Sequence, residues 1–373
     1  MSIIRSIESQ IIKRFSKHKA ILIFGARQVG KTTLVENLFK NRDDVVFFDG
    51  DEADHRDRLS DTTSTHLKSL IGKNKIVCID EAQRIDNIGL TLKLFTDKIK
   101  DVQIIATGSS AFELANKLNE PLTGRKYEFH LFPLSFEEMA NHHGLLEESR
   151  LLHHRLVFGY YPEIVTTPGS EIENLKLIAN SYLYKDLLML ESIKKPVLLQ
   201  KLVKALALQV GSEVSFNELS RLVEADKETV EKYIDALEKS YIIFQLPSLS
   251  RNVRNELKKS RKIYFYDNGI RNAVAGNFSP LENRTDTGAL WENFFISERI
   301  KTMMNKGADA KYYFWRTTQQ QEIDFIEEQD GGLTAFEIKW KMDKALFPAT
   351  FMNAYPKTKT HIITQKNYPE FLI

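Results

Sequence analysis

The chain has 373 residues, which is too long for a single hydrophobic core and predicts two or three domains. Hydrophobic residues make up 42% and charged residues 27%, as is typical of a soluble globular protein. A formal net charge of +2 excludes a global electrostatic attraction to nucleic acid or membranes, so any such surface must be local. The single cysteine, Cys78, excludes an internal disulfide and a cysteine-ligated zinc site.

No apolar stretch of the sequence approaches the length needed to cross a membrane. The first residues, Met1 to Arg5, lack the apolar core of a secretory signal. We therefore expect a cytoplasmic protein that makes no use of a membrane.

The first informative element is an apolar strand at residues 20–24, followed by a glycine-rich turn and a helix that reaches Phe39. The turn and the first helical residues are Gly25, Ala26, Arg27, Gln28, Val29, Gly30, Lys31, Thr32 and Thr33. Glycines in this context let several backbone amides point at one anion. Lys31 can then reach the outer phosphates of a nucleotide, and the Thr32 hydroxyl can ligate Mg²⁺. The pattern predicts binding of a nucleoside triphosphate.

A second strand is predicted at residues 45–48, and a third ends in the acids Asp80 and Glu81. Asp80 would hold Mg²⁺ through its water shell, and Glu81 would orient or deprotonate the attacking water. A fold that only binds nucleotide does not need the second acid, so hydrolysis is favoured over binding alone. The alternative is a pair of solvated loop acids.

Two more strands are predicted at residues 102–106 and 126–131, which gives five strands separated by helices and hence a parallel sheet with an added central strand. The fourth strand ends in Thr107-Gly108-Ser109-Ser110. Thr107 and Ser109 are equally good candidates for a hydroxyl that senses the γ-phosphate, and we carry Ser109 forward as a nucleotide-binding residue. A simple turn is the alternative.

Arg125 precedes the fifth strand and could stabilise charge in the transition state, either in cis or across a subunit interface. The alternative is an ordinary surface arginine. Arg27 could likewise pair with a neighbouring acid rather than touch phosphate.

Four sequence motifs occur in this order over about the first 140 residues: GARQVGKTTL, VCIDEAQ, ATGSSAFEL and TGRKYEFHLFPLSFEE. They resemble a prokaryotic ATPase family related to AAA+ and STAND proteins. The resemblance implies ATP as the nucleotide, and it implies nucleotide-site roles for Lys31, Thr32, Asp80 and Glu81.

Helical spacing with few breakers continues from residue 135 to 193 and predicts a helical lid. Three helices at 197–210, from Ser215 with a capping-box start, and at 226–240, followed by a strand at 241–246, predict a winged helix-turn-helix. The third helix carries three lysines against five acids, a net charge of −2 that is wrong for insertion beside phosphates.

The stretch from Arg251 to Lys262 is strongly basic, with one acid, Glu256. Its basic residues are Arg251, Arg254, Lys258, Lys259, Arg261 and Lys262. If the chain contacts nucleic acid, we expect the contact here. A solvated basic linker is the alternative.

Near the C-terminal end, a helix beginning at Trp291 is followed by predicted strands at 311–315, 322–326 and 334–340, then a helix and a strand. This is the order of the restriction-endonuclease core, and Asp324…Glu337-x-Lys339 resembles its PD-(D/E)xK signature. Glu337 and Lys339 are two apart on one strand and share a face.

Asp324 on the adjacent strand can meet Glu337 and hold a divalent cation, and Glu292 on the first helix could complete the metal shell. Lys339 would position or activate the attacking water. The alternatives are a structural Lys339–Asp324 ion pair, or a nuclease fold without activity.

The sequence as a whole predicts an α/β protein in which a P-loop, AAA-like parallel sheet is joined to a helical lid, a winged helix and an α/β nuclease-like domain. The predicted boundaries are 1–134 for the ATPase core, 135–195 for the lid, 196–250 for the winged helix-turn-helix, 251–285 for a basic linker and 286–373 for the nuclease-like domain.

We expect an ATP-hydrolysing switch, dependent on Mg²⁺, that controls a nuclease-like or partner-binding domain. One alternative is an active, ATP-regulated and Mg²⁺-dependent nuclease on DNA or RNA. Another is an oligomeric remodelling ATPase in which Arg125 acts in trans, so a homo-oligomer or a protein partner is also among the expectations.

Overall fold

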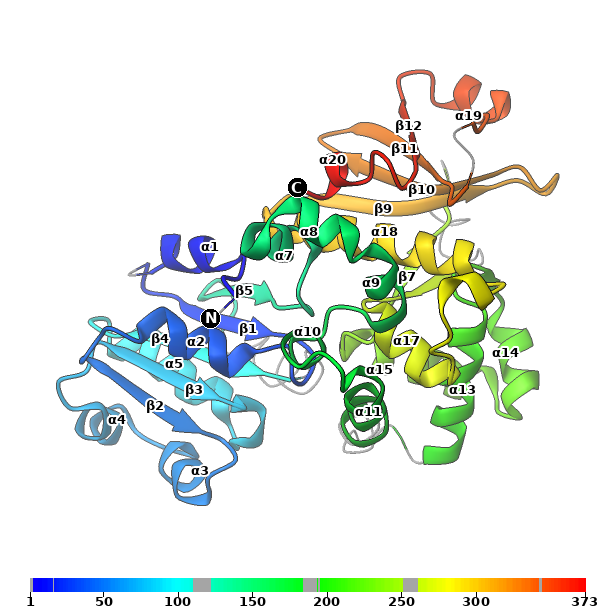
Figure 1. Cartoon of the computed structure of the whole chain (residues 1–373). Coiled ribbons are helices and arrows are strands. Elements are labelled where there is room, and N and C mark those ends of the chain that lie inside the picture. Colours follow the sequence, from blue (N-terminus) through cyan, green and yellow to red (C-terminus); the bar gives the residue numbers. More distant parts are fainter. Residues whose placement is uncertain are drawn as a thin grey trace. The chain divides into compact units, whose positions relative to one another are not determined.

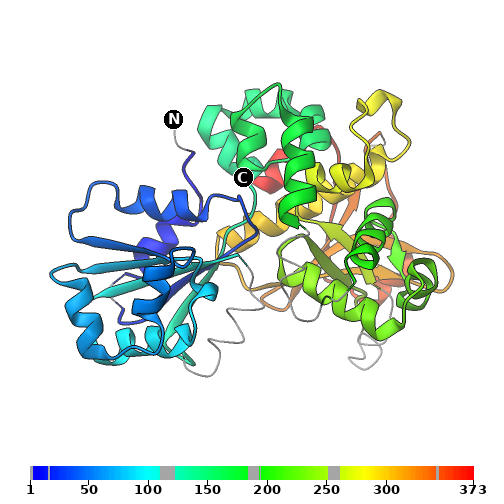
Figure 2. The same cartoon turned by 90° about the horizontal axis from the view of Figure 1, so that it is seen from below.

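The computed structural model describes residues 3–15, 17–109, 122–183, 193, 195–250, 261–341 and 344–373. The chain divides into two compact units. We call the first, made of Ser2–Phe132 with Lys239–Tyr241, the N-terminal unit, and the second, made of Pro133–Glu238 with Ile242–Ile373, the C-terminal unit. Figures 1 and 2 show the elements of each unit in two views. None of the helices in the described ranges is both long and apolar enough to span a lipid bilayer.

The N-terminal unit contains a parallel five-stranded sheet (Figure 1). Its strands are β1 (Ala20–Phe24), β2 (Val45–Asp49), β3 (Ile76–Asp80), β4 (Gln103–Gly108) and β5 (Lys126–His130), in the order β2-β3-β4-β1-β5. The five predicted strands are therefore confirmed, and β4 is the added central strand between β1 and β3. Because the strands are parallel, the segments that follow β1, β3 and β4 leave the sheet at one common edge.

The helices of this unit are α1 (Glu8–Lys13), α2 (Lys31–Phe39), α3 (Ala53–Leu59), α4 (Ser64–Ile71), the 3₁₀ turn η1 (Ala82–Arg84) and α5 (Ile88–Lys98). Every residue of β1 and β4 is buried, as expected for central strands of a parallel sheet that is covered on both faces. Cys78 is buried in β3, and burial raises the pKa of its thiol, which makes it an inert core residue.

The C-terminal unit begins with a run of short helices where the lid was predicted. They are α7 (Phe136–His143), α8 (Leu145–Arg150), α9 (Leu152–Phe158), α10 (Pro162–Thr166), α11 (Glu171–Leu177) and the π-helical turn η2 (Ile178–Leu183). A capping box starts α7, with the Glu138 amide donating to the Ser135 hydroxyl and the Ser135 amide donating to the Glu138 carboxylate.

The next elements alternate helices and short strands: α13 (Pro196–Leu208), β6 (Glu213–Val214), α14 (Phe216–Val223), α15 (Lys227–Lys239), β7 (Ile243–Pro247) and β8 (Arg261–Phe265). The strands form an antiparallel sheet in the order β6-β8-β7. The three predicted helices are present. The expected capping box at Ser215 is wrong, because the Ser215 side chain makes no capping hydrogen bond at the start of α14.

The predicted linker at 251–285 is also wrong in its second half. Residues 251–260 lie outside the described ranges, but the rest of the segment carries β8, α17 (Asn268–Ala275) and the turn η3 (Leu281–Asn283). β8 is almost entirely buried, so it is part of the core of the unit. Asp267 caps α17, accepting the amide of Ile270 at 3.0 Å and that of Tyr160 at 2.6 Å.

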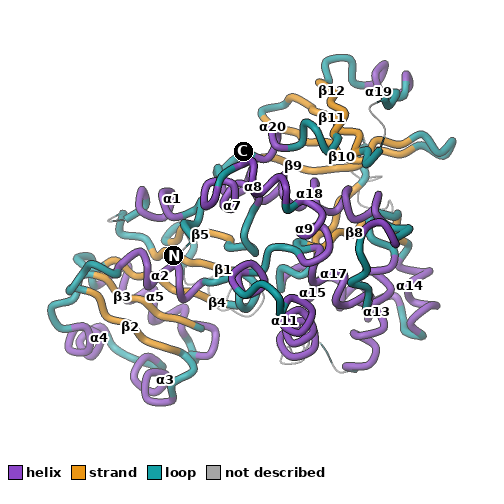
Figure 3. Tube along the Cα trace, in the orientation of Figure 1, coloured by secondary structure: helices purple, strands orange, loops and turns teal. Residues whose placement is uncertain are grey.

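The last elements are α18 (Thr287–Asn305), β9 (Ala310–Arg316), β10 (Glu322–Gln329), β11 (Gly332–Ile338), α19 (Ala349–Ala354), β12 (Lys359–Ile363) and α20 (Pro369–Leu372). The strands form a sheet in the order β12-β11-β10-β9, with β11 and β12 parallel and the other neighbours antiparallel (Figure 3). The predicted order of helix, three strands, helix and strand is confirmed. The pairing of β9 with β10 shifts register between Ile323 and Ile326, so Asp324 lies at a bulge.

Candidate nucleotide site and candidate acidic site

The glycine-rich loop after β1 has the backbone geometry that the sequence predicts. A Cβ atom on Gly25 would lie 2.1 Å from the Leu131 carbonyl oxygen, so only glycine fits. Gly30 caps α2 with a φ of 91°, in the left-handed region. Between them, Ala26 and Val29 are buried, Arg27 and Gln28 are half-buried, and Thr33 is exposed on the first turn of α2.

Lys31 is buried, and its ammonium group lies inside the loop. It donates to the carbonyl oxygens of Gly25 at 3.0 Å and Ala26 at 2.9 Å. A cation held on the concave side of a loop of backbone amides is the arrangement that binds phosphate.

Arg5 holds this loop in place, and the sequence analysis did not predict it. Its guanidinium donates to the carbonyl oxygen of Val29 in the loop and to that of Phe132 after β5, each at 2.7 Å. Arg5 thus ties the loop to the neighbouring strand end, and it is 7% exposed. Its partners are 24 and 127 residues away, so no local pattern reveals it.

Asp80, at the end of β3, accepts hydrogen bonds from two hydroxyl groups. Thr32 Oγ1 donates to Asp80 Oδ2 at 2.5 Å, and Thr107 donates to the other carboxylate oxygen. A threonine hydroxyl and a carboxylate beside a phosphate-binding loop fit a Mg²⁺ ion, since both are oxygen ligands. Of the two candidate hydroxyl groups at the end of β4, that of Thr107 donates to Asp80. Ser109 is therefore the candidate whose hydroxyl does not bond to this carboxylate.

Glu81 has a φ of 44°, in the left-handed region, and follows Asp80 directly. Its carboxylate accepts a hydrogen bond from the side-chain amide of Gln83, which also donates to Ser109 Oγ at 2.9 Å. Gln83 belongs to the quoted VCIDEAQ string, but its link to Ser109 spans 26 residues and was not predicted.

Arg125 does not reach this site within its own chain. Its backbone oxygen accepts the amide of Ala20, the first residue of β1, whereas the phosphate-binding loop follows Phe24 at the opposite end of that strand. Its guanidinium pairs with Asp97 at 2.7 Å. A cis role for Arg125 is therefore wrong, because the sheet separates it from the loop.

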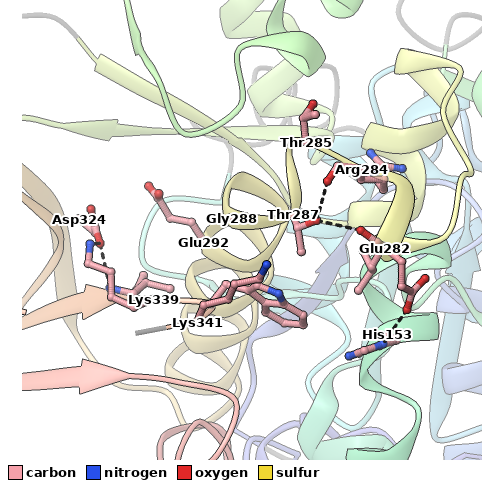
Figure 4. Close-up of a pocket in the computed structure, with 13 residues that line it drawn as sticks. His153, Glu282, Arg284, Thr285, Thr287, Gly288, Glu292, Asp324, Lys339 and Lys341 are labelled. Atoms are coloured by element: carbon pink, nitrogen blue, oxygen red, sulfur yellow. Dashed lines mark hydrogen bonds and ion pairs between the residues drawn. The ribbon is translucent and has the colours of Figure 1, made fainter. Parts of the chain in front are cut away.

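The acidic site lies in the C-terminal unit, beside a cavity of about 600 Å³. Figure 4 shows Asp324 and Lys339 facing each other, with Glu292 on the adjacent helix α18 and with His153 and Glu282 farther along the pocket. The cavity is also lined by Leu281, Arg284, Thr285, Thr287, Gly288, Ile338, Trp340 and Lys341.

The three signature residues lie together, and the Lys339–Asp324 ion pair that was the alternative to a metal site is present. Lys339 donates to Asp324 at 3.1 Å and to Glu337 at 2.7 Å, and the amide of Ile338 donates to Asp324 at 2.8 Å. Lys339 follows β11, but its backbone amide still bonds to Ile363 of β12, so it keeps the register of the strand. Burial and the nearby charge of Asp324 raise the pKa of Glu337 to about 7.

Glu292 is held by residues of β8. Lys262 donates to Glu292 at 3.2 Å and to Glu322 at 2.5 Å, and the Tyr264 hydroxyl donates to Glu292 at 2.5 Å. Lys262 is 2% exposed. Burial alone would lower its pKa, but the carboxylates of Glu292 and Glu322 raise it above the ordinary value.

Lys262 therefore cannot serve as a nucleic-acid contact at the end of a solvated basic stretch, because its ammonium is buried among acids. Arg261 is half-buried and donates to Gln245 at 2.9 Å. Arg251, Arg254, Lys258 and Lys259 lie outside the described residues.

In the arrangement described, the acids do not form a ready metal site. Across the described ranges, no group of three or more His, Cys, Asp or Glu side chains is placed to hold a metal ion. Lys339 pairs with both Asp324 and Glu337, and Lys262 pairs with Glu292. The same finding covers two pairs of adjacent histidines, His142-His143 and His153-His154, of which His143 contacts Glu148 and His154 contacts Glu171.

Comparison with known proteins supports the N-terminal assignment. Residues 17–140 match the model of a family described as an AAA domain. The walker-type ATPase of Pyrococcus abyssi superposes with a TM-score of 0.50 at 17% identity, covering 73% of this chain and 96% of that protein. The N-terminal unit has a P-loop ATPase fold. At 17% identity, the similarity to the Pyrococcus abyssi structure indicates a shared fold and nothing about activity.

The relatives and the remaining family models carry no stated activity. An uncharacterized protein of Mycobacterium tuberculosis is 27% identical over 340 residues, which cover 90% of this chain and 73% of the relative. An uncharacterized protein of Methanocaldococcus jannaschii is 26% identical over 340 residues, covering 79% and 71%. Downstream of the ATPase fold, residues 149–281 and 287–369 each match a domain of unknown function.

Proposed function

We propose that the chain binds and hydrolyses ATP with Mg²⁺ in the N-terminal unit, and that this cycle controls the activity or the contacts of the C-terminal unit. The observation that carries the proposal is the convergence of Lys31, Thr32 and Asp80 at one sheet edge, with Glu81 beside them. The matched AAA domain supports ATP as the nucleotide.

Each residue has a distinct role in this proposal. The loop amides and Lys31 bind the phosphates, while Thr32 and Asp80 hold Mg²⁺. When bound, Mg²⁺ neutralises charge that develops on the phosphate oxygens. Glu81 accepts a hydrogen bond from the attacking water and orients it. Ser109, at the end of β4, contacts the outer phosphate.

Two substitutions test the proposal. Lys31→Ala removes the cation of the loop and is expected to abolish ATP binding, measured by equilibrium titration with a fluorescent ATP analogue. Glu81→Gln keeps the shape of the side chain but weakens its hold on water, so ATP still binds while hydrolysis falls about 100-fold or more. Lys40→Ala, an exposed lysine after α2, is the matched control. ATP hydrolysis that persists unchanged in Glu81→Gln would rule out this site as its source.

A second candidate function is Mg²⁺-dependent cleavage of DNA or RNA by the C-terminal unit. The contacts of Lys339 with Asp324 and Glu337 favour it, since Lys339 and Asp324 line a cavity. The ion pairs of Lys262 and Lys339 favour the other reading, in which the nuclease-like domain binds a partner without cutting.

The order of α13, β6, α14, α15, β7 and β8 supports a winged-helix arrangement in the C-terminal unit. The net charge of −2 over residues 226–240, which include α15, argues against insertion of this helix beside phosphates. A role of this segment in contacts with protein is the better proposal.

The third alternative is an oligomeric remodelling ATPase, in which Arg125 acts on the nucleotide site of a neighbouring copy. The partly exposed Arg125–Asp97 pair would have to open for this role. Such an enzyme hydrolyses ATP at a rate per chain that rises with protein concentration.

A further inference from the structure

We infer that Gln83 is a positioning residue for ATP hydrolysis, which connects the phosphate-sensing hydroxyl of Ser109 to the water-orienting carboxylate of Glu81. The inference rests on the proposed function, because it gives Glu81 its role in hydrolysis. It adds a residue to which the sequence analysis gave no role in the reaction.

The backbone places the three side chains together. β3 and β4 are parallel neighbours, with Ile79 paired to Ala106, so the chain leaves both strands at one edge. Glu81 turns the chain through its left-handed φ of 44°, and the short turn η1 follows immediately. This turn brings Gln83 back toward the end of β4, where Ser109 lies.

A single amide group makes both contacts. The Gln83 side-chain nitrogen donates to Glu81 and to Ser109 Oγ, and an amide has two N–H bonds to give. Gln83 and Ser109 are each 6% exposed, so water does not readily replace either partner. Hydrogen bonds to a charged carboxylate in such surroundings are strong and orient it.

The direction of these hydrogen bonds suggests how the group acts. Ser109 accepts from Gln83, so its own proton is directed to another acceptor. An outer phosphate oxygen at the end of β4 supplies such an acceptor. The chain of donors then runs from Ser109 to phosphate and from Gln83 to Ser109 and Glu81. With one carboxylate oxygen fixed by Gln83, the other oxygen of Glu81 is oriented toward the attacking water.

The competing explanation is that Gln83 only stabilises the turn after β3. A structural role predicts a lower melting temperature and an equal loss of nucleotide binding and turnover. A positioning role predicts that kcat falls while KM for ATP stays the same, because Gln83 touches Glu81 and Ser109 rather than the nucleotide.

The test uses the full chain and two substitutions. Gln83→Met has a similar length but no N–H donor, so it leaves the packing nearly intact. We expect kcat for ATP to fall at least 10-fold, with KM within twofold of the unsubstituted protein. Gln319→Ala, at an exposed glutamine of the C-terminal unit, is the control and should change neither constant.

Gln83→Glu gives a signature that a structural role does not. The introduced carboxyl repels Glu81 when ionised but can donate to it when protonated. Its kcat relative to the unsubstituted protein should therefore rise as the pH is lowered from about 8 to 6. Gln83→Met should show no such recovery.

The outcomes separate the two levels of proposal. If the unsubstituted protein and Glu81→Gln hydrolyse ATP equally, the proposed function fails. If Glu81→Gln is inactive but Gln83→Met keeps its full kcat, or Gln83→Glu shows no recovery at low pH, only the role of Gln83 is overturned. Ser109→Ala should lower kcat less than Gln83→Met, and the double variant should be no worse than Gln83→Met alone.

Discussion

Glu337 is an unusual residue for its position, because a carboxyl that is 6% exposed lies between a lysine and a second acid. Its pKa of about 7 in the folded protein is higher than the ordinary value of 4.5. Protons therefore bind more tightly in the folded state than in the unfolded chain. The stabilising effect of this group is fully present below about pH 4.5 and is lost as the pH rises through 7.

Glu337→Gln removes this titration. We expect the free energy of unfolding of the variant, relative to the unsubstituted protein, to increase between pH 5 and pH 8, by at most about 3 kcal/mol. Urea denaturation at several pH values measures this difference. Glu370→Gln, at an exposed glutamate, is the control. A difference that does not vary with pH would contradict the raised pKa.

The site residues that could be predicted from the sequence are those that belong to a short, contiguous motif. Lys31 and Thr32 belong to one loop, and Asp80 and Glu81 follow one strand. Sequence analysis missed Arg5 and Gln83 and assigned Lys262 to a basic surface. The partners of these residues are 24 or more residues away, apart from the contact of Gln83 with Glu81. Side-chain hydrogen bonds across the sheet depend on packing that no local pattern encodes.

At the level of elements, capping illustrates the same limit. Ser135-Phe136-Glu137-Glu138 and Ser215-Phe216-Asn217-Glu218 have the same capping-box pattern, yet only the first forms the reciprocal hydrogen bonds. The backbone ψ is 161° at Ser135 and 122° at Ser215, which aims the second hydroxyl differently. At Ser215, where a capping-box start was predicted, the helix begins as expected, but the pattern could not determine the cap geometry.

The strand β8 joins two parts of the C-terminal unit, because it pairs with β6 and β7 and also supplies Lys262 to the acids on α18 and β10. Lys262→Ala would leave Glu292 and Glu322 without their buried cation. We expect the free energy of unfolding to fall by about 3–5 kcal/mol. Chemical denaturation is the measurement, with Lys311→Ala at an exposed lysine on β9 as the control. A loss below about 0.5 kcal/mol would show that these acids do not depend on Lys262.

At the scale of the whole molecule, the proposed ATP cycle needs an output, for which the C-terminal unit is the candidate. The nuclease candidate predicts that the full chain with Mg²⁺ cleaves DNA or RNA and that ATP changes the rate. Asp324→Ala and Lys339→Ala should each abolish cleavage, because they remove the acid at the β10 bulge and the lysine that contacts it. Gel assays with labelled substrates measure the products.

The control for this assay is Asp330→Ala, in the exposed turn between β10 and β11, which should cut normally. Cleavage that survives both site variants would come from a contaminant or another site. If the unsubstituted protein does not cut under any of these conditions, the nuclease candidate is excluded and a binding role for the C-terminal unit is favoured.

The attachment of α18 to β8 determines which fragment of the C-terminal unit can fold by itself. Besides the Lys262 pair, the Asn293 side chain bonds to the backbone amide and carbonyl of Phe265, at 2.8 and 3.0 Å. A gene fragment that began at α18 would encode acids without their lysine and an asparagine without its strand. We therefore expect a fragment carrying this sheet to fold on its own only if it begins upstream of residue 261, so that β8 is included.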